Sequence, residues 1–153
     1  MKPRSPAEEV RQAALRLLRY RDRSVREMRE RLKKKGYDRN LIEREIERLI
    51  QERLLDDARF TGVWIRHKLA ISHKGKRLIA AELGAKGIDA ELFRKVWSEH
   101  LEDEIRSARE WALAHAKGYG LLELFERRGR IREGLYRRGY SQEAADAALK
   151  EIE

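Results

Sequence analysis

Three copies of one short pattern recur along the chain at a nearly constant interval. Each copy places Leu four residues before a glycine, Lys or Arg directly before it, an apolar residue after it and then Asp or Ser. The three glycines, Gly36, Gly87 and Gly139, are 51 and 52 residues apart. A fixed period of this length predicts repeated structural units, each of which buries its apolar side against a neighbour.

Each copy also has the features of one helix ending and another beginning. A basic residue in the last turn suits the negative end of a helix, and glycine accepts the left-handed conformation that closes it. Asp38, Asp89 and Ser141 stand two residues after the glycines. At that position a side-chain oxygen accepts hydrogen bonds from the free N–H groups of the next helix. The pattern therefore predicts three helix–corner–helix units.

Apolar residues at matching positions indicate the buried faces of these helices. They lie eight residues before and ten residues after each glycine: Met28, Ile79, Ile131, Ile46, Trp97 and Leu149. No segment shows the alternation of a β-strand. We expect an all-α protein of about nine helices, arranged as an elongated array of three tandem three-helix repeats. The predicted repeats cover residues 1–55, 56–101 and 102–153.

Three local patterns add detail to this prediction. Ser24 and Glu27 have the spacing of a capping box, which starts a helix. Apolar and aromatic side chains at helical spacing predict one buried stripe with a structural histidine at its centre, namely Phe60, Trp64, His67 and Ile71. The two glycines of residues 117–120 predict a flexible joint before a helix that begins at Leu121.

The charge balance favours a polyanionic partner. The 36 Lys and Arg residues outnumber the 27 Asp and Glu residues, which gives a net charge of +9. The basic residues are concentrated ahead of each glycine corner, so repeats stacked in register would line one side of the array with positive charge. The alternative is that these side chains form ordinary solvated helix faces.

Several classes of protein are disfavoured by what the sequence lacks. The chain has no cysteine, which excludes disulfides and Cys-ligated metal. No apolar run approaches the roughly 20 residues of a membrane span, and the first residues lack the apolar core of a signal peptide. We therefore expect a cytoplasmic protein without a membrane partner.

A search for catalytic residues is also negative. The four histidines show no metal-binding pair at helical spacing, and none of the serines lies in a nucleophile elbow. Asp56 and Asp57 fit a helix cap better than a magnesium site. We expect no enzymatic activity, no cofactor and no metal, so the sequence favours a binding protein.

Basic side chains that are left over when carboxylates are paired at helical spacing are candidates for an external anion. In the first repeat Glu27 can pair with Arg31 and Glu30 with Lys34, which leaves three cations over: Arg26, Arg29 and Lys33. In the third repeat, Glu126 and Glu133 can pair with Arg130 and Arg137, which leaves other arginines free: Arg127, Arg128, Arg132 and Arg138.

The segment from His73 to Arg77 is a further candidate anion site. It places Lys74, Lys76 and Arg77 around Gly75, at the start of a predicted helix. Cations there oppose the helix dipole, at a local cost of roughly 0.3–1 kcal/mol each. Together with the free N–H groups of the helix start, they favour a phosphate or carboxylate ligand.

Three groups of residues, mostly between residues 13 and 92, resemble the RecX family of bacterial RecA regulators. They are Leu17-Leu18 with Arg21-Asp22-Arg23-Ser24, Glu27, Leu32 and Lys35-Gly36-Tyr37; Leu55-Asp56-Asp57-Ala58-Arg59-Phe60; and Gly75 with Arg77-Leu78-Ile79, Glu82-Leu83 and Lys86-Gly87-Ile88-Asp89. The third repeat matches through Arg138-Gly139-Tyr140-Ser141. Lys76 stands where the family often has proline, so that loop is more basic here.

The resemblance implies tandem three-helix repeats that lie in the helical groove of the RecA–DNA filament. A protein of this family is expected to inhibit RecA recombinase, ATPase and coprotease activities in recombination, DNA repair and the SOS response. We expect a monomer whose binding to single- or double-stranded DNA alone is weak. The predicted RecA/DNA-binding residues are the basic candidates of all three repeats: Arg26, Arg29, Lys33, Lys74, Lys76, Arg77, Arg127, Arg128, Arg132 and Arg138.

A direct, largely sequence-nonspecific DNA-binding protein is the alternative. A three-helix unit with a sharp corner also resembles helix-turn-helix modules. However, the helices expected after the corners, over residues 39–53 and 90–100, are acidic or mixed in charge. This composition disfavours sequence-specific recognition of DNA.

Overall fold

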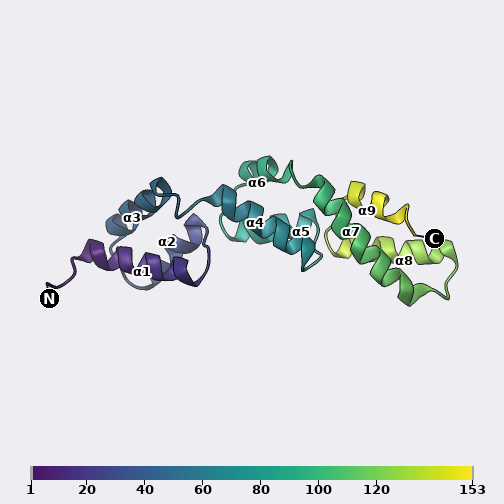
Figure 1. Cartoon of the computed structure of the whole chain (residues 1–153), viewed down its shortest axis with the longest axis horizontal. Coiled ribbons are helices and arrows are strands. Elements are labelled where there is room, and N and C mark those ends of the chain that lie inside the picture. The colour runs from purple at the N-terminus through teal and green to yellow at the C-terminus, as the bar shows by residue number, and fades with distance from the viewer. Residues whose placement is uncertain (1, 153) are drawn as a thin grey trace. The chain divides into compact units, whose positions relative to one another are not determined.

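A computed structural model describes residues 2–152, and within them every regular element is helical (Figure 1). Nine α-helices and one short 3₁₀ helix, η1, follow one another in this part of the chain. Their bounds are α1 Pro6–Tyr20, α2 Val25–Lys34, α3 Arg39–Gln51, α4 Asp57–Ala70, α5 Lys76–Ala85, α6 Ala90–Trp97, α7 Leu101–Ala116, η1 Lys117–Tyr119, α8 Leu124–Arg137 and α9 Gln142–Leu149. The all-α prediction with nine α-helices is confirmed.

The described residues form two compact units. Unit 1 contains residues 2–60 together with the short segment 85–88, and unit 2 contains residues 61–84 and 89–152. The chain therefore passes between the units within α4 and again on either side of the second glycine corner. The division into three repeats, over residues 1–55, 56–101 and 102–153, stays a prediction.

Unit 1 has a core built from one face of each of its first three helices. α1 contributes Val10 and Ala14, α2 contributes Met28, and α3 contributes Ile46 and Leu49. Capping boxes begin α1 and α2, with Ser5 paired to Glu8 and Ser24 paired to Glu27. Each box satisfies N–H groups that a helix start leaves open. The predicted Ser24–Glu27 box is confirmed.

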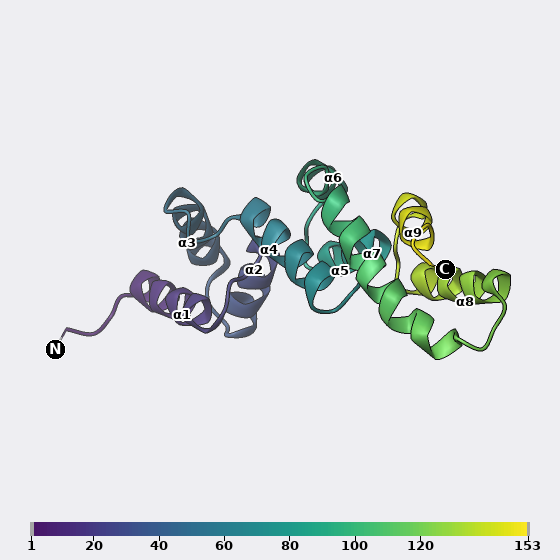
Figure 2. The ribbon, with the colours of Figure 1, turned by 45° about the vertical axis from the view of Figure 1, so that its right-hand side comes forward.

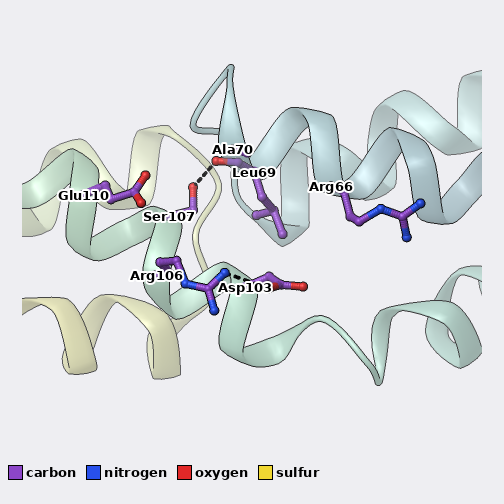
Figure 3. A pocket seen from close by; sticks show the side chains of 7 residues that line it. All are labelled: Arg66, Leu69, Ala70, Asp103, Arg106, Ser107 and Glu110. Carbon is purple, nitrogen blue, oxygen red and sulfur yellow. Dashed lines mark hydrogen bonds and ion pairs between the residues drawn. The ribbon is translucent and has the colours of Figure 1, made fainter.

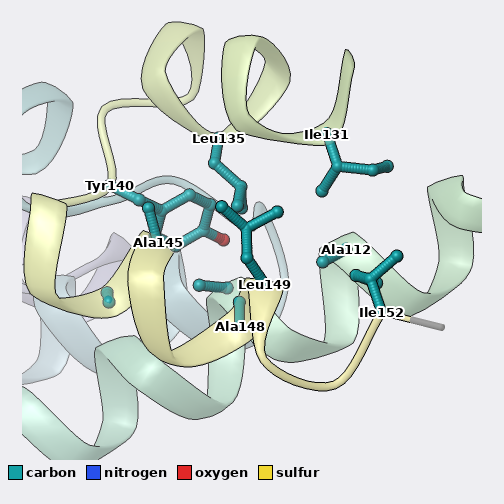
Figure 4. Packing of buried hydrophobic residues seen from close by; sticks show 10 residues of the cluster. Ala112, Ile131, Leu135, Tyr140, Ala145, Ala148, Leu149 and Ile152 are labelled. Atoms are coloured by element: carbon teal, nitrogen blue, oxygen red, sulfur yellow. The ribbon is translucent and has the colours of Figure 1, made fainter. Parts of the chain in front are cut away.

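Unit 2 has a core in which small side chains let helices approach closely. Ala108 and Ala112 of α7 belong to the same buried cluster as Ala148 of α9. Figure 4 shows Ala112 and Ala148 in this cluster together with larger residues of α8 and α9. α7 lies beside both α8 and α9 (Figure 2). Ile131 and Leu135 are fully buried between these helices, so the unit depends on apolar packing around α7.

The three glycine corners have the predicted conformation. Gly36, Gly87 and Gly139 have φ angles of 88°, 86° and 86°. Asp38, Asp89 and Ser141 cap the helices that follow, as predicted. The six apolar residues at matching positions around the corners are all buried: Met28, Ile79, Ile131, Ile46, Trp97 and Leu149.

The corners differ in what surrounds them. A Cβ atom added to Gly36 would meet nothing within 4 Å, whereas at Gly139 it would lie 2.7 Å from the Leu78 side chain and 2.8 Å from its backbone nitrogen. Gly75, just before α5, lies equally close to the third corner, because its added Cβ would be 2.3 Å from the Tyr140 backbone. The third corner is therefore packed directly against the start of α5.

The predicted buried stripe of the fourth helix is confirmed at Phe60, which is buried, and wrong by about one position farther along. Ile65 and Leu69 are buried on α4, whereas His67 is exposed and Ile71, just beyond the helix, is 69% exposed. Trp64 is half-buried, and its indole N–H donates to Glu82 over 3.0 Å. Val63, Trp64 and Ile65 are consecutive apolar residues that point to three different sides of the helix. Helical spacing alone therefore does not show which of these sides is buried.

The predicted joint at residues 117–120 contains a short helical turn. Lys117–Tyr119 form η1, and α8 begins at Leu124 rather than at Leu121. The Arg127 guanidinium donates to the carbonyls of Tyr119 and Gly120, each over 3.3 Å. These hydrogen bonds tie the connection to the first turn of α8.

Alanine substitutions at three glycines are expected to separate backbone strain from packing. Gly36→Ala places a side chain in left-handed backbone with open space around it, which costs roughly 1–2 kcal/mol. Gly139→Ala adds a clash with Leu78 and is expected to cost more. Gly129→Ala, in helical backbone with open space, is the control and is expected to stabilise by up to about 1 kcal/mol. Urea unfolding followed by circular dichroism measures all three, and equal losses at Gly36 and Gly139 would contradict this packing.

Candidate binding surface

The structure places the ten predicted binding residues in two groups, one in each compact unit. Arg26, Arg29 and Lys33 lie on α2 of unit 1. The other seven residues lie in unit 2, around α5 and α8. The structure also shows internal partners for most of them, which sequence spacing did not reveal.

In unit 1, two of the three arginine and lysine candidates are paired. Arg26 contacts Glu30 one turn along α2, with Nε and Oε1 3.1 Å apart. Arg29 contacts Glu43 of α3 over 2.6 Å. This hydrogen bond raises the pKa of Arg29 and lowers the pKa of Glu43. The prediction that both arginines lack a partner is therefore wrong, whereas Lys33 is exposed and has no ion-pair partner in the described part of the chain.

Arg29, Lys33 and Arg39 line one side of a small hollow in unit 1. It has a volume of about 300 Å³, and Ile42 and Glu43 complete its wall. Arg39 was not among the predicted binding residues. Its position directly after the corner, at the first residue of α3, is the sequence signal that identifies it.

Glu27 of unit 1 joins α2 to two cations outside this helix, Arg21 just before it and Lys86 in segment 85–88. Its carboxylate accepts hydrogen bonds from Arg21, over 2.5 Å, and from Lys86, over 3.1 Å. Burial favours the neutral carboxyl, but the hydrogen bonds from Arg21, the Ser24 backbone N–H and Lys86 outweigh it and lower the pKa of Glu27 to about 2. The carboxylate therefore holds segment 85–88 against the start of α2.

In unit 2, the predicted anion site at the start of α5 is occupied by the protein itself. The Lys76 N–H donates to the Glu104 carboxylate over 2.9 Å. The Gly75 and Arg77 N–H groups donate to the carbonyls of Arg138 and Gly139 over 2.8 and 3.0 Å. The helix start does bind a carboxylate, as predicted. However, this carboxylate is the side chain of Glu104 on α7 and not an external ligand.

Glu104 is fully buried and also holds the start of α9. It accepts hydrogen bonds from the Ser141 N–H, over 3.1 Å, and from the Ser141 hydroxyl. A carboxylate at the N-termini of two helices is stabilised by both helix dipoles as well as by the donated hydrogen bonds. Glu104 thereby fixes α5 and α9 relative to each other.

Four further candidates in unit 2 hold other parts of the chain in place. Lys74 contacts Glu82 over 2.7 Å. Arg138 donates to the carbonyls of Ser72 and His73, and Arg128 donates to the carbonyl of Leu149 over 2.8 Å. Arg127 ties the loop before α8, as described above. The prediction that Arg127, Arg128 and Arg138 have no internal partner is therefore wrong.

The remaining three candidates of unit 2, Lys76, Arg77 and Arg132, converge on one groove. It has a volume of about 510 Å³ and lies between α5, α8 and α9. Its lining residues are Lys76, Arg77, Ala80, Arg132, Tyr136, Gly139, Tyr140, Ser141, Gln142, Ala145 and Asp146. Arg132 lies 3.5 Å from Asp146, so it too has a partner that the sequence analysis did not find, although its side chain is 62% exposed.

Tyr136 is the aromatic residue of this groove that the sequence analysis missed. It is 69% exposed on α8. The Arg77 guanidinium lies 5.1 Å from the centre of its ring and donates to its backbone carbonyl over 2.8 Å. The sequence did contain a signal for Tyr136. It stands three residues before Gly139, just as the predicted binding residue Lys33 stands three residues before Gly36.

The hollows of the two units occupy matching positions in the repeat. Arg29 and Arg132 each stand seven residues before a corner glycine, and their partners Glu43 and Asp146 stand seven residues after it. Around the second corner these positions hold Ala80 and Arg94. An arginine–carboxylate pair therefore flanks the first and third corners but not the second.

A second hollow in unit 2, of about 200 Å³, lies between α4 and α7 (Figure 3). Arg106 pairs with Asp103 over 3.2 Å, and the Ser107 hydroxyl donates to the carbonyl of Leu69. Ser107 also contacts Tyr140, whose pKa rises to about 12 because burial disfavours the phenolate. These polar groups satisfy one another, which makes this hollow a weaker candidate than the groove.

Residues 2–152 contain no group of three or more His, Cys, Asp or Glu side chains arranged to hold a metal ion. Among the helices of the same stretch, none has both the length and the apolar character needed to cross a lipid bilayer.

Glu104→Gln is expected to destabilise unit 2. The amide oxygen can still accept from both backbone N–H groups, but the charge is lost and the NH2 group takes the place of the oxygen that accepts from the Ser141 hydroxyl, a loss of roughly 1.5–3 kcal/mol. Glu102→Gln, at an exposed position of the same helix, is the control and is expected to change stability by less than about 0.5 kcal/mol. Urea unfolding compares the two variants, and similar small effects would contradict the role given to Glu104.

The contribution of Glu27 is expected to depend on pH. Its pKa lies below the ordinary value of 4.5, so its stabilising effect is present above about pH 4.5 and is lost as the pH falls toward 2. The unfolding free energy of the unaltered chain should exceed that of Glu27→Gln by up to roughly 3 kcal/mol at pH 5. This difference should shrink steadily between pH 4.5 and 2 in urea titrations, and a constant difference would contradict the assignment.

The sequence of this chain is similar to known regulatory proteins. The family model of the RecX first three-helix domain matches residues 11–49, and that of the second three-helix domain matches residues 56–96. The regulatory protein RecX of Geobacillus thermodenitrificans is 34% identical over 142 residues, which are 90% of this chain and 52% of that protein. The regulatory protein RecX of Mycolicibacterium smegmatis is 38% identical over 90 residues, which are 59% of this chain and 48% of that protein. The chain thus spans about half the length of the curated relatives it matches.

Two solved structures share the fold. The crystal structure of RecX from Lactobacillus salivarius superimposes with a TM-score of 0.88 at 22% identity, covering 96% of each chain. A second crystal structure of a regulatory protein RecX gives a TM-score of 0.81 at 20% identity, covering 95% of this chain and 74% of the other. The two family models together match more than half of the chain, which therefore belongs to the RecX family.

Proposed function

We propose that this chain is a non-enzymatic regulator that binds the RecA–DNA filament. In this role it inhibits the recombinase, ATPase and coprotease activities of RecA during recombination, DNA repair and the SOS response, in the cytoplasm and without a cofactor. The observation that carries the proposal is membership of the RecX family, whose matched relatives are named regulatory proteins.

The distribution of positive charge supports a polyanionic partner. Each unit presents exposed cations beside a hollow: Lys33 and Arg39 in unit 1, and Lys76, Arg77 and Arg132 in unit 2. Contacts of this kind with phosphates release counterions and make binding strongly dependent on salt. Arg127, Arg128 and Arg138 stay in the proposed set, but their hydrogen bonds to carbonyls give them a structural task as well.

Direct binding to DNA is the second candidate function. The observation that favours it is the groove of unit 2, where an exposed tyrosine lies among three cations. Such a surface binds nucleic acid through backbone charge and base stacking, without reading the sequence. In this case the affinity for DNA should fall steeply with salt and be nearly the same for unrelated sequences.

The proposed function is tested by the ATPase activity of RecA on single-stranded DNA. Inhibition is expected when this protein is added, well below one molecule per RecA if it caps filament ends and near one-to-one if it occupies the filament groove. Lys33→Glu with Lys76→Glu should raise the concentration for half-inhibition roughly tenfold. It should also make the dependence of filament affinity on log salt shallower by about two units, since two phosphate contacts are lost.

Lys2→Glu with Arg4→Glu is the matched control, because it changes the net charge equally at exposed residues that line neither hollow. Melting curves show that the variants are folded. If both double variants weaken inhibition equally, the effect is due to net charge alone. Lys33 and Lys76 would then not contact the filament. Failure of the unaltered protein to inhibit RecA at any ratio would overturn the proposed function.

A further inference from the structure

We infer that the groove between α5, α8 and α9 binds one nucleotide of single-stranded DNA, with its base against Tyr136 and its phosphates at Lys76, Arg77 and Arg132. The inference rests on the proposed function, for which it specifies a ligand and a site. Its argument has three parts: the aromatic wall, the charged rim and the floor of the groove.

Tyr136 provides an aromatic face for a base. Its side chain is 69% exposed on the solvent side of a helix whose Ile131 and Leu135 are fully buried. The Arg77 guanidinium lies over the ring at 5.1 Å and limits its movement. Exposed aromatic side chains beside arginine form the stacking platforms of single-strand-binding proteins, where each stacked base contributes roughly 1–3 kcal/mol.

The rim of the groove provides positive charge in a fixed position. The Arg77 guanidinium is held by its hydrogen bond to the Tyr136 carbonyl, which leaves other N–H groups for a phosphate. Lys76 lies next to Arg77 on α5, and Arg132 approaches from α8. Asp146 is the one carboxylate among the lining residues, and it lies 3.5 Å from Arg132. The balance at the rim is therefore positive.

The floor of the groove fits a planar ring. Ala80, Gly139 and Ala145 line it with small groups. At the matching positions of unit 1, Ile42 replaces Ala145 and Lys33 replaces Tyr136, and the hollow is smaller, about 300 Å³ instead of 510 Å³. The small side chains leave more room beside Tyr136 than unit 1 has at the matching place, and a base stacked on that ring needs this room.

The test compares two labelled oligonucleotides of equal length by fluorescence anisotropy at low salt, without RecA. One is oligothymidylate, and the other has abasic sites that keep the phosphates and remove the bases. Tyr136→Ala is expected to weaken binding of oligothymidylate roughly tenfold and to leave binding of the abasic strand nearly unchanged. The phosphate site survives because Arg77 is held by a backbone carbonyl.

Two variants serve as controls. Tyr136→Phe keeps the ring and should retain the affinity of the unaltered protein. Tyr20→Ala removes a ring that is 85% exposed on α1 of unit 1 and should leave both affinities unchanged. Melting temperatures of all variants should agree, since both rings are on the surface.

Three outcomes would overturn the inference: no binding of oligothymidylate by the unaltered protein, equal weakening on both strands by Tyr136→Ala, or no effect of that substitution. If Tyr136→Ala abolishes inhibition of RecA while DNA binding is unchanged, the groove contacts protein rather than DNA. The RecA assay is independent of these results, so the proposed function can fail while Tyr136-dependent binding of DNA holds, and the reverse.

Discussion

The close approach of the third glycine corner to the start of α5 is the constraint on which unit 2 depends. Side chains are excluded on both sides of this contact, because a Cβ on Gly75 or Gly139 would lie less than 3 Å from backbone atoms of the other segment. The contact in turn brings α5 beside α8 and α9. The groove with its cations and its exposed tyrosine exists because these three helices meet there.

The parts of the structure that the sequence predicted well are local ones. Left-handed glycines, the caps at Asp38 and Ser141, and the buried residues at matching positions follow from interactions within one or two helical turns. The threefold recurrence of the pattern strengthened these predictions. A single glycine followed by Asp or Ser has several structural explanations, whereas three copies at equal spacing indicate the same helix corner each time. The all-α class and the number of helices followed from them.

The parts that the sequence did not predict depend on partners distant in the chain. Arg29 pairs with Glu43 of another helix. At the start of α5, the Lys76 N–H donates to Glu104, which lies 28 residues farther along the chain. Helical spacing describes one helix at a time, so basic residues that looked free have internal partners. The face of α4 was misplaced for a related reason: its neighbours in space, rather than its own pattern, decide which of its apolar residues is buried.

The position of Glu104 has a consequence for how the molecule opens. Its carboxylate satisfies the N–H groups of Lys76 and Ser141, which belong to different helices and are 65 residues apart in the chain. Any fluctuation that withdraws α7 exposes both helix ends at once, so these two amide protons should exchange with solvent as a linked pair. The helix starts of α5 and α9, far apart in sequence, would then behave as a single cooperative element within unit 2.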